Sequence, residues 1–164
     1  TRQSGSPAEA AALVRQIGYE SGAGFLEEFT AWLMHHRHDP GIAPGDLSAD
    51  EFWHLLSAFF GRIGWGHLHF EQLHEGVAAL GSPDWVEGRV VERVRQPSCH
   101  FTTGMLADLL GRLTDSEVAV LEVACQARGD GSCRFLFGSP EGLQRVYDGL
   151  RSGQAVDEVL RALT

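Results

Sequence analysis

Apolar residues recur at helical spacing through residues 8–34, which predicts a long N-terminal helix. The pair Ser6-Pro7 supplies its start signal. Glycines in the middle of this stretch lower helix stability, so we expect a kink or a break there. The apolar positions are Ala12, Leu13, Ile17, Phe25, Leu26, Phe29, Trp32 and Leu33, and the glycines are Gly18, Gly22 and Gly24.

A second helix is expected over residues 48–61, where Ser48 and Glu51 have the spacing of a capping box. The pattern then changes from helical spacing to strict alternation. Alternation over residues 67–73 predicts a strand, and residues 77–80 can return beside it as the second strand of a hairpin.

Two further helix starts follow the first hairpin. The triplet Ser-Pro-Asp at 82–84 combines an N-cap, a proline at the first helical position and an acid in the first turn, and predicts a helix to about residue 95. Pro97-Ser98 leads into another helix. Its glycines, Gly104 and Gly111, are small enough to let a second element approach closely.

A second hairpin is predicted for residues 117–127 and 133–137, because both are rich in apolar residues and the turn residues Arg-Gly-Asp-Gly at 128–131 separate them. Helices over about 140–151 and 155–163 then close the chain.

These elements predict an α+β fold, with an antiparallel sheet built from two hairpins and helices packed on it. The chain has 164 residues, enough to bury a core without disulfides. We expect residues 1–7 to be a linker or a disordered start, and residues 8–164 to form a single domain.

The composition narrows the class of protein. Hydrophobic residues make up 43% and charged residues 21%, as in ordinary globular proteins. The net charge of −9 and the scattered basic residues argue against direct contact with nucleic acid. The sequence contains no apolar run of bilayer length and no secretory leader. We therefore expect a soluble, cytoplasmic protein that does not bind membranes.

The three cysteines are an odd number for a disulfide scaffold. Cys125 and Cys133 fall opposite each other in the second hairpin, where they could form a disulfide or share a metal ion. Glu122 could join them if a bulge turned its side chain to the same face. Cys99, at a helix start, could supply a fourth ligand. Burial of the cysteines as small apolar residues is the remaining alternative.

The part of the chain from residue 97 to 164 resembles the 4-vinyl reductase domain. The resemblance lies in a pattern of cysteine, glycine, glutamate, cysteine, Gly-Asp and cysteine, carried by residues 97–107, 121–130 and 133–135. In phenol-responsive transcription activators with this domain, three cysteines and one glutamate bind zinc. The resemblance therefore implies that zinc is bound by Cys99, Glu122, Cys125 and Cys133.

The same resemblance implies a fold similar to the ligand-binding fold of NO-signalling and Golgi-transport proteins. Members of the family are often dimeric and hold an apolar aromatic molecule or a tetrapyrrole. The N-terminal sensor region of the phenol activators is not recognisable in this chain, so their ligand contacts cannot be carried over.

Aromatic residues crowd the first half of the chain, as a pocket for a flat apolar ligand requires, although each of them also suits an ordinary core. Tryptophan can offer a donor at the edge of an apolar wall. Two histidines that share a strand face could bind a ligand or a metal, or simply face solvent. The candidate ligand-binding residues are Trp53, Trp65, Trp85, Phe60, His67 and His69.

We therefore expect a homodimeric, zinc-braced sensor or carrier domain for an apolar aromatic, hydrocarbon-like or tetrapyrrole ligand. No catalytic constellation is recognisable, so a non-catalytic role is favoured. One alternative is an enzyme or accessory protein in chlorophyll-type vinyl reduction, although the sequence has no nicotinamide or flavin fingerprint. The other alternative is a scaffold subunit like those of trafficking complexes.

Overall fold

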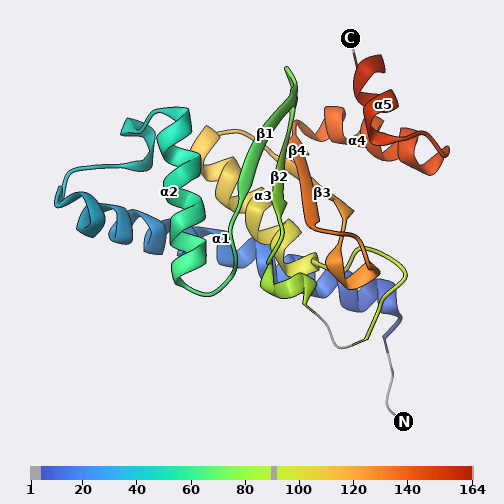
Figure 1. The fold of residues 1–164 in the computed structure, drawn as a ribbon, viewed down its shortest axis with the longest axis horizontal. Helices are drawn as coiled ribbons and strands as arrows, with labels where there is room; N and C mark the ends of the chain where they lie inside the picture. The colour runs from blue at the N-terminus through green and yellow to red at the C-terminus, as the bar shows by residue number, and fades with distance from the viewer. Residues whose placement is uncertain (1–4, 90–91, 164) are drawn as a thin grey trace.

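The computed structural model describes residues 5–89 and 92–163. Its helices and strands follow one another in the order shown in Figure 1. In chain order they are α1 (Pro7–Arg37), the 3₁₀ helix η1 (Pro44–Asp46), α2 (Ala49–Arg62), β1 (His69–His74), β2 (Val77–Ser82), η2 (Val86–Gly88), α3 (His100–Thr114), β3 (Ala119–Ala124), η3 (Gln126–Arg128), β4 (Cys133–Gly138), α4 (Pro140–Arg151) and α5 (Val156–Ala162).

The four strands form one antiparallel sheet in the order β1-β2-β4-β3. Each face of the sheet carries its own apolar core. Leu80 and Phe135 pack with α1, α2 and α3 on one face, whereas Val77 and Leu136 pack with α4 and α5 on the other. The expected α+β class and the two hairpins are therefore confirmed.

The expected break in the first helix is wrong, because α1 is one continuous helix of 31 residues. Its glycines are used for packing. A Cβ atom on Gly18 would overlap the Phe101 carbonyl of α3, and one on Gly22 would overlap the Asp108 side chain. In return, a Cβ on Gly104 of α3 would overlap the Arg15 carbonyl of α1. The close approach predicted for Gly104 is thus confirmed, and α1 is its neighbour.

The second helix begins as expected. The Ser48 hydroxyl accepts a hydrogen bond from the Glu51 backbone N–H, and the Glu51 carboxylate accepts one from the Ser48 N–H, which completes the capping box. The strand after it begins at His69, two residues later than predicted. The later helices, α3 to α5, lie close to their predicted positions.

The helix predicted from the Ser-Pro-Asp triplet is wrong. Ser82 ends β2, and the described residues between it and α3 contain only the short helix η2; Val90 and Val91 lie outside the described residues. Instead of capping a helix, the Asp84 carboxylate accepts hydrogen bonds from the backbone N–H and the ring nitrogen of His67, both at 2.8 Å. A side chain of this type can satisfy either kind of partner, and here the distant one wins.

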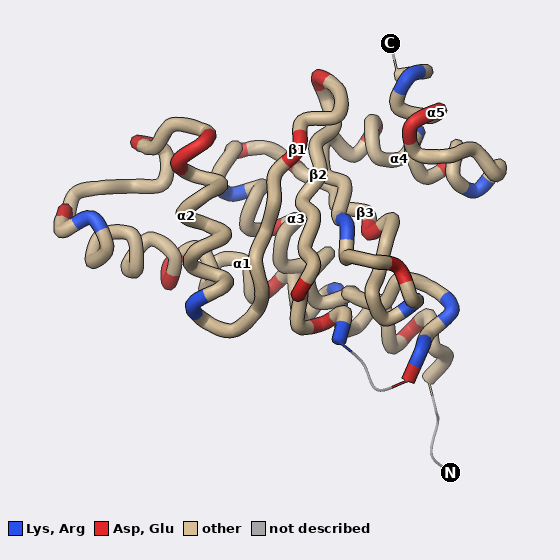
Figure 2. Tube along the Cα trace, viewed as in Figure 1, with Lys and Arg blue, Asp and Glu red and all other residues tan. Residues whose placement is uncertain are grey.

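Acidic and basic residues are interspersed along the chain trace, and arginines do not gather on one element (Figure 2). Among the described helices, none combines the length and the apolar character that crossing a bilayer requires.

We predict that Gly104→Ala lowers the free energy of unfolding by about 1–3 kcal/mol, because the new methyl group would push α1 and α3 apart. The matched control is Gly24→Ala on α1, where a Cβ meets open space. That change should raise the free energy of unfolding by about 0.5–1 kcal/mol. Urea denaturation of both variants measures the difference, and equal effects would contradict the proposed helix contact.

We also predict a pH-dependent contribution from Asp84. Hydrogen bonds from the His67 backbone and side chain lower the pKa of this carboxyl from 3.8 to about 2. Its stabilisation is therefore complete above pH 3.8 and disappears as the pH falls through about 2. Because the side chain is 30% exposed, solvent screening limits the contribution to about 1 kcal/mol. Thermal denaturation of Asp84→Asn at pH 7 and pH 2 should show a loss only at pH 7, whereas Glu75→Gln in the exposed turn should show none.

Candidate metal centre

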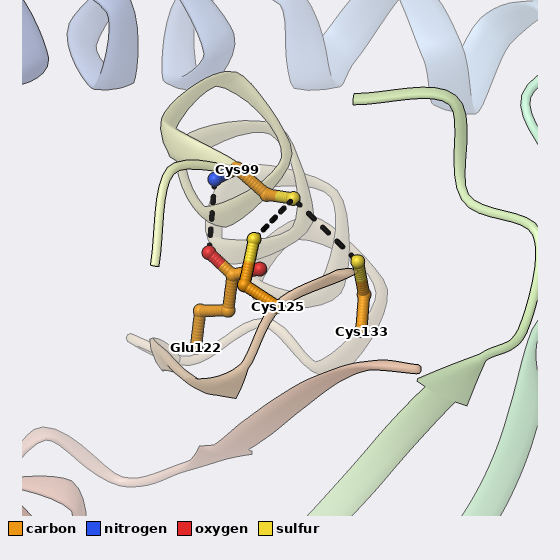
Figure 3. Close-up of side chains that lie close together, drawn as sticks. All are labelled: Cys99, Glu122, Cys125 and Cys133. Carbon is orange, nitrogen blue, oxygen red and sulfur yellow. Dashed lines mark hydrogen bonds between the residues drawn. The ribbon is translucent and has the colours of Figure 1, made fainter. Parts of the chain in front are cut away.

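Three cysteines and one glutamate come together beside the start of α3 (Figure 3). Their ligand atoms all lie within 4.8 Å of one another, and all four residues are buried. The Cys99 Sγ lies 3.9 Å from the sulfur atoms of both Cys125 and Cys133. The Cys99 backbone N–H donates to Glu122 Oε2 at 2.9 Å. We call these four residues the quartet.

The second hairpin positions three members of the quartet. Glu122 pairs with Phe135 and Ala124 with Arg134, so the register shifts by one residue between them. This irregularity turns Glu122 and Cys125 to the same side of the hairpin, as the sequence analysis required. Cys125 follows the end of β3 and Cys133 begins β4. The fourth member, Cys99, is the N-cap residue of α3.

The turn between the strands holds Cys125 by its backbone. The Asp130 carboxylate accepts a hydrogen bond from the Cys125 N–H at 2.8 Å and another from Arg128 Nε at 2.9 Å. Gly129 has a φ of 105°, a conformation that favours glycine. The Gly-Asp pair in the sequence thus shapes the corner that carries Cys125.

Burial and mutual repulsion shift the acidity of the quartet. Burial raises the pKa of the Glu122 carboxyl, against the opposing effect of hydrogen bonds from Cys99 and Cys125. The hydrogen bond with Cys133, burial and the charge of Glu122 raise the pKa of the Cys99 thiol. The same hydrogen bond lowers the pKa of Cys133. Without a positive charge, several ionised ligands are therefore unfavourable here.

The quartet fits a metal ion by its donors and by one unsatisfied atom. Glu122 Oε1 is buried and has no hydrogen-bond partner among the described residues, whereas Oε2 is bonded to Cys99. A free carboxylate oxygen beside three sulfur atoms suits a borderline-soft divalent cation. The three cysteines are free, and the sulfur separations of 3.9 Å around Cys99 exceed the roughly 2.05 Å of a disulfide.

Two further contacts support the sulfur of Cys133. The Gln126 backbone N–H donates to it at 3.5 Å. A Cβ on Gly88 would overlap the same sulfur, so only glycine leaves room for it. Neither residue was predicted, because a glutamine and a glycine in loops give no local signal of such a contact.

A second carboxylate holds the start of α3. Glu87 accepts hydrogen bonds at 2.9 Å from the backbone N–H groups of both Phe101 and Thr102. It also accepts one from the Thr102 hydroxyl, to which the Trp85 indole donates at 2.8 Å. Glu87 therefore caps the helix from η2, and links it to a buried tryptophan. Sequence reasoning missed this residue, because it had assigned the segment to a helix.

The structure brings together three of the six predicted ligand-binding residues. The ring centroids of Phe60, Trp65 and Trp85 lie 5.4 to 6.4 Å apart, and Phe60 and Trp85 are fully buried. We call these three residues the aromatic cluster. Their involvement in ligand binding stays a prediction.

The other three predicted residues lie elsewhere. Trp53 stacks on Phe70 of β1, with centroids 4.6 Å apart. His67 and His69 are exposed, and His67 is paired with Asp84. A hollow of about 510 Å³ beside α1 and α2 is lined by none of the six residues.

Comparison with solved structures shows what the fold is similar to. The phenol-responsive sensory domain of the transcription activator PoxR, solved with phenol, aligns with a TM-score of 0.60 and 17% identity over 90% of this chain and 71% of that chain. A trafficking protein particle complex subunit 3 from Naegleria fowleri, covalently bound to palmitic acid, aligns with a TM-score of 0.61 and 13% identity over 80% of each chain.

A vinyl-4-reductase family protein from Methanocaldococcus jannaschii aligns with a TM-score of 0.44 and 16% identity, over 77% of this chain and 91% of that chain. A sequence comparison with curated proteins gave no match. The family comparison did give one: residues 86–139, which include the whole quartet, match the 4-vinyl reductase domain. The chain is therefore a member of the 4-vinyl reductase domain family, and residues 86–139 are the part that carries the match.

Proposed function

We propose that this protein is a zinc-braced domain that binds an apolar aromatic, hydrocarbon-like or tetrapyrrole molecule, as a sensor or carrier and without catalysis. The observation that carries the proposal is its match to the 4-vinyl reductase domain together with a fold similar to the phenol-responsive sensory domain of PoxR. The proposal includes a homodimer in the cytoplasm, where reducing conditions would keep the three thiols free. Sedimentation velocity would test the dimer by its mass, twice 17.9 kDa.

The metal part of the proposal rests on the quartet. Zinc would be held by the sulfur atoms of Cys99, Cys125 and Cys133 and by Glu122 Oε1, the buried oxygen that lacks a partner among the described residues. Four protein ligands make a structural site, which adds folding free energy instead of activating water. The quartet would thereby tie the second hairpin to the start of α3.

The ligand part of the proposal rests on the aromatic cluster and its link to α3. Trp85 contacts Phe60 and Trp65 on one side and donates to Thr102 in the first turn of α3 on the other. A ligand that moved these rings would therefore act directly on the helix that carries Cys99. This contact offers a physical route by which occupancy could change the packing of α3.

The scaffold alternative has support from the fold alone, through the similarity to the trafficking subunit. That subunit is bound covalently to palmitic acid. All three cysteines of the present chain belong to the quartet, so a thioester on any of them would remove a metal ligand. The quartet therefore favours a metal-braced, non-covalent binding domain over an acylated scaffold.

We predict that Glu122→Gln weakens zinc binding by more than the roughly 10–100-fold that loss of an outer partner usually costs, because it removes a charged ligand. Glu87→Gln is the matched control: both carboxylates accept N–H groups at the start of α3, but only Glu122 lies among the thiols. The control should lower the melting temperature and keep one zinc per chain. Native mass spectrometry and a competition titration with a chelator measure both, and unchanged zinc affinity in Glu122→Gln would refute the metal site.

We predict that Trp65→Leu weakens the binding of phenol by roughly tenfold, equivalent to about 1.4 kcal/mol, because Trp65 is the partly exposed member of the aromatic cluster. Trp32→Leu is the control, since Trp32 is also partly buried but stacks on His36. Isothermal titration with phenol, and with palmitic acid in parallel, tests the ligand class. Equal affinities for phenol in both variants would remove the aromatic cluster from the site, and preference for palmitic acid would favour the scaffold alternative.

A further inference from the structure

An open groove lies where the C-terminal end of α2 meets α1, with a volume of about 510 Å³. Its lining combines apolar residues with three glutamates and contains neither lysine nor arginine. The residues from α1 are Glu20, Ser21, Gly24, Phe25, Glu27 and Glu28, and α2 and its end contribute Phe59 and Ile63.

An exposed apolar stripe on α1 continues the groove toward the N-terminus. At 100° per residue, Leu13 and Ile17 lie on the same helix face as Gly24. Leu13 is 61% exposed and Ile17 is 48% exposed, and Ile63 at the groove itself is 44% exposed. From residue 13 to residue 28 this face extends for roughly 24 Å, enough to lie along a helix of four turns.

Gly24 differs from the other central glycines of α1. The space beside Gly18 and Gly22 is occupied by α3, but a Cβ on Gly24 would have no neighbour within 4 Å. Glycine inside a helix costs about 0.5–1 kcal/mol relative to alanine. No described contact of Gly24 offsets this cost, and its missing side chain leaves room for another backbone to approach α1 closely.

The charge of the rim selects the kind of partner. Glu20, Glu27 and Glu28 are exposed. If a second copy packed the same face antiparallel to this one, it would set carboxylates against carboxylates, which is unfavourable. A helix with an apolar stripe flanked by lysine or arginine would match both the floor and the rim.

We propose that this groove is a docking site for an amphipathic helix with a basic polar face, supplied by a partner polypeptide. The apolar stripe of that helix would cover Phe25, Phe59 and Ile63, and its closest approach would be at Gly24. The proposal does not depend on the quartet, because none of the groove residues contributes to it.

The probe is a synthetic 18-residue amphipathic helix of leucine and lysine, labelled with fluorescein, and a scrambled peptide of the same composition. Fluorescence anisotropy at physiological salt measures binding to the full chain. We expect the amphipathic peptide to bind roughly tenfold tighter than the scrambled one. Gly24→Gln, which fills the floor with a good helix former and should not destabilise α1, is expected to cause a similar loss.

The control separates docking from the general attraction between a basic peptide and an acidic protein. Glu27→Lys with Glu28→Lys should weaken binding roughly tenfold, whereas Glu75→Lys with Glu117→Lys changes the net charge equally and should weaken it less than about threefold. Equal losses in the two double variants, or equal binding of both peptides, would overturn the proposal. A wild-type dimer that Gly24→Gln converts to monomer in sedimentation would also overturn it, because a second copy would then occupy the groove.

Discussion

The close crossing of α1 and α3 determines where α3 can lie, and the candidate metal centre depends on that position. The contact is made by glycines on both helices, so backbone meets backbone with no side chain between them. Glu87 and Glu122 then hold the first turn of α3 from two different segments. Cys99 is thereby placed over the hairpin that carries the other members of the quartet. A change in the helix crossing would move one ligand relative to three.

The sequence predicted elements well where the signal was local. The capping box of α2, both hairpins and the bulge between Glu122 and Ala124 follow from patterns within a few residues. The quartet was reached through the resemblance to the 4-vinyl reductase domain, since spacing alone left a disulfide and plain burial open. The family match over residues 86–139 agrees with that resemblance.

The errors arose where a distant partner decided the outcome. Helical periodicity cannot show that α3 fills the space beside Gly18, so the glycines were interpreted as a break. Asp84 has the position of a helix-start residue, yet its partner is His67, seventeen residues earlier. Glu87 gave no signal because capping by a residue outside the helix follows no fixed spacing. The aromatic residues were too numerous for sequence alone to separate Phe60, Trp65 and Trp85 from the stack of Trp53 on Phe70.

The order of the strands has a consequence for how the protein reaches its native state. β2 and β4 are neighbours in the sheet, but α3 and β3 lie between them in the chain. Each hairpin can form from local contacts, whereas joining them requires closure of a long loop, a slow step in folding. Ser82 pairs with Cys133 at the end of this joint, so the quartet lies where the two hairpins meet. A cation captured there would recognise the assembled sheet and not an isolated hairpin, and the centre would thus act as a checkpoint on the last stage of folding.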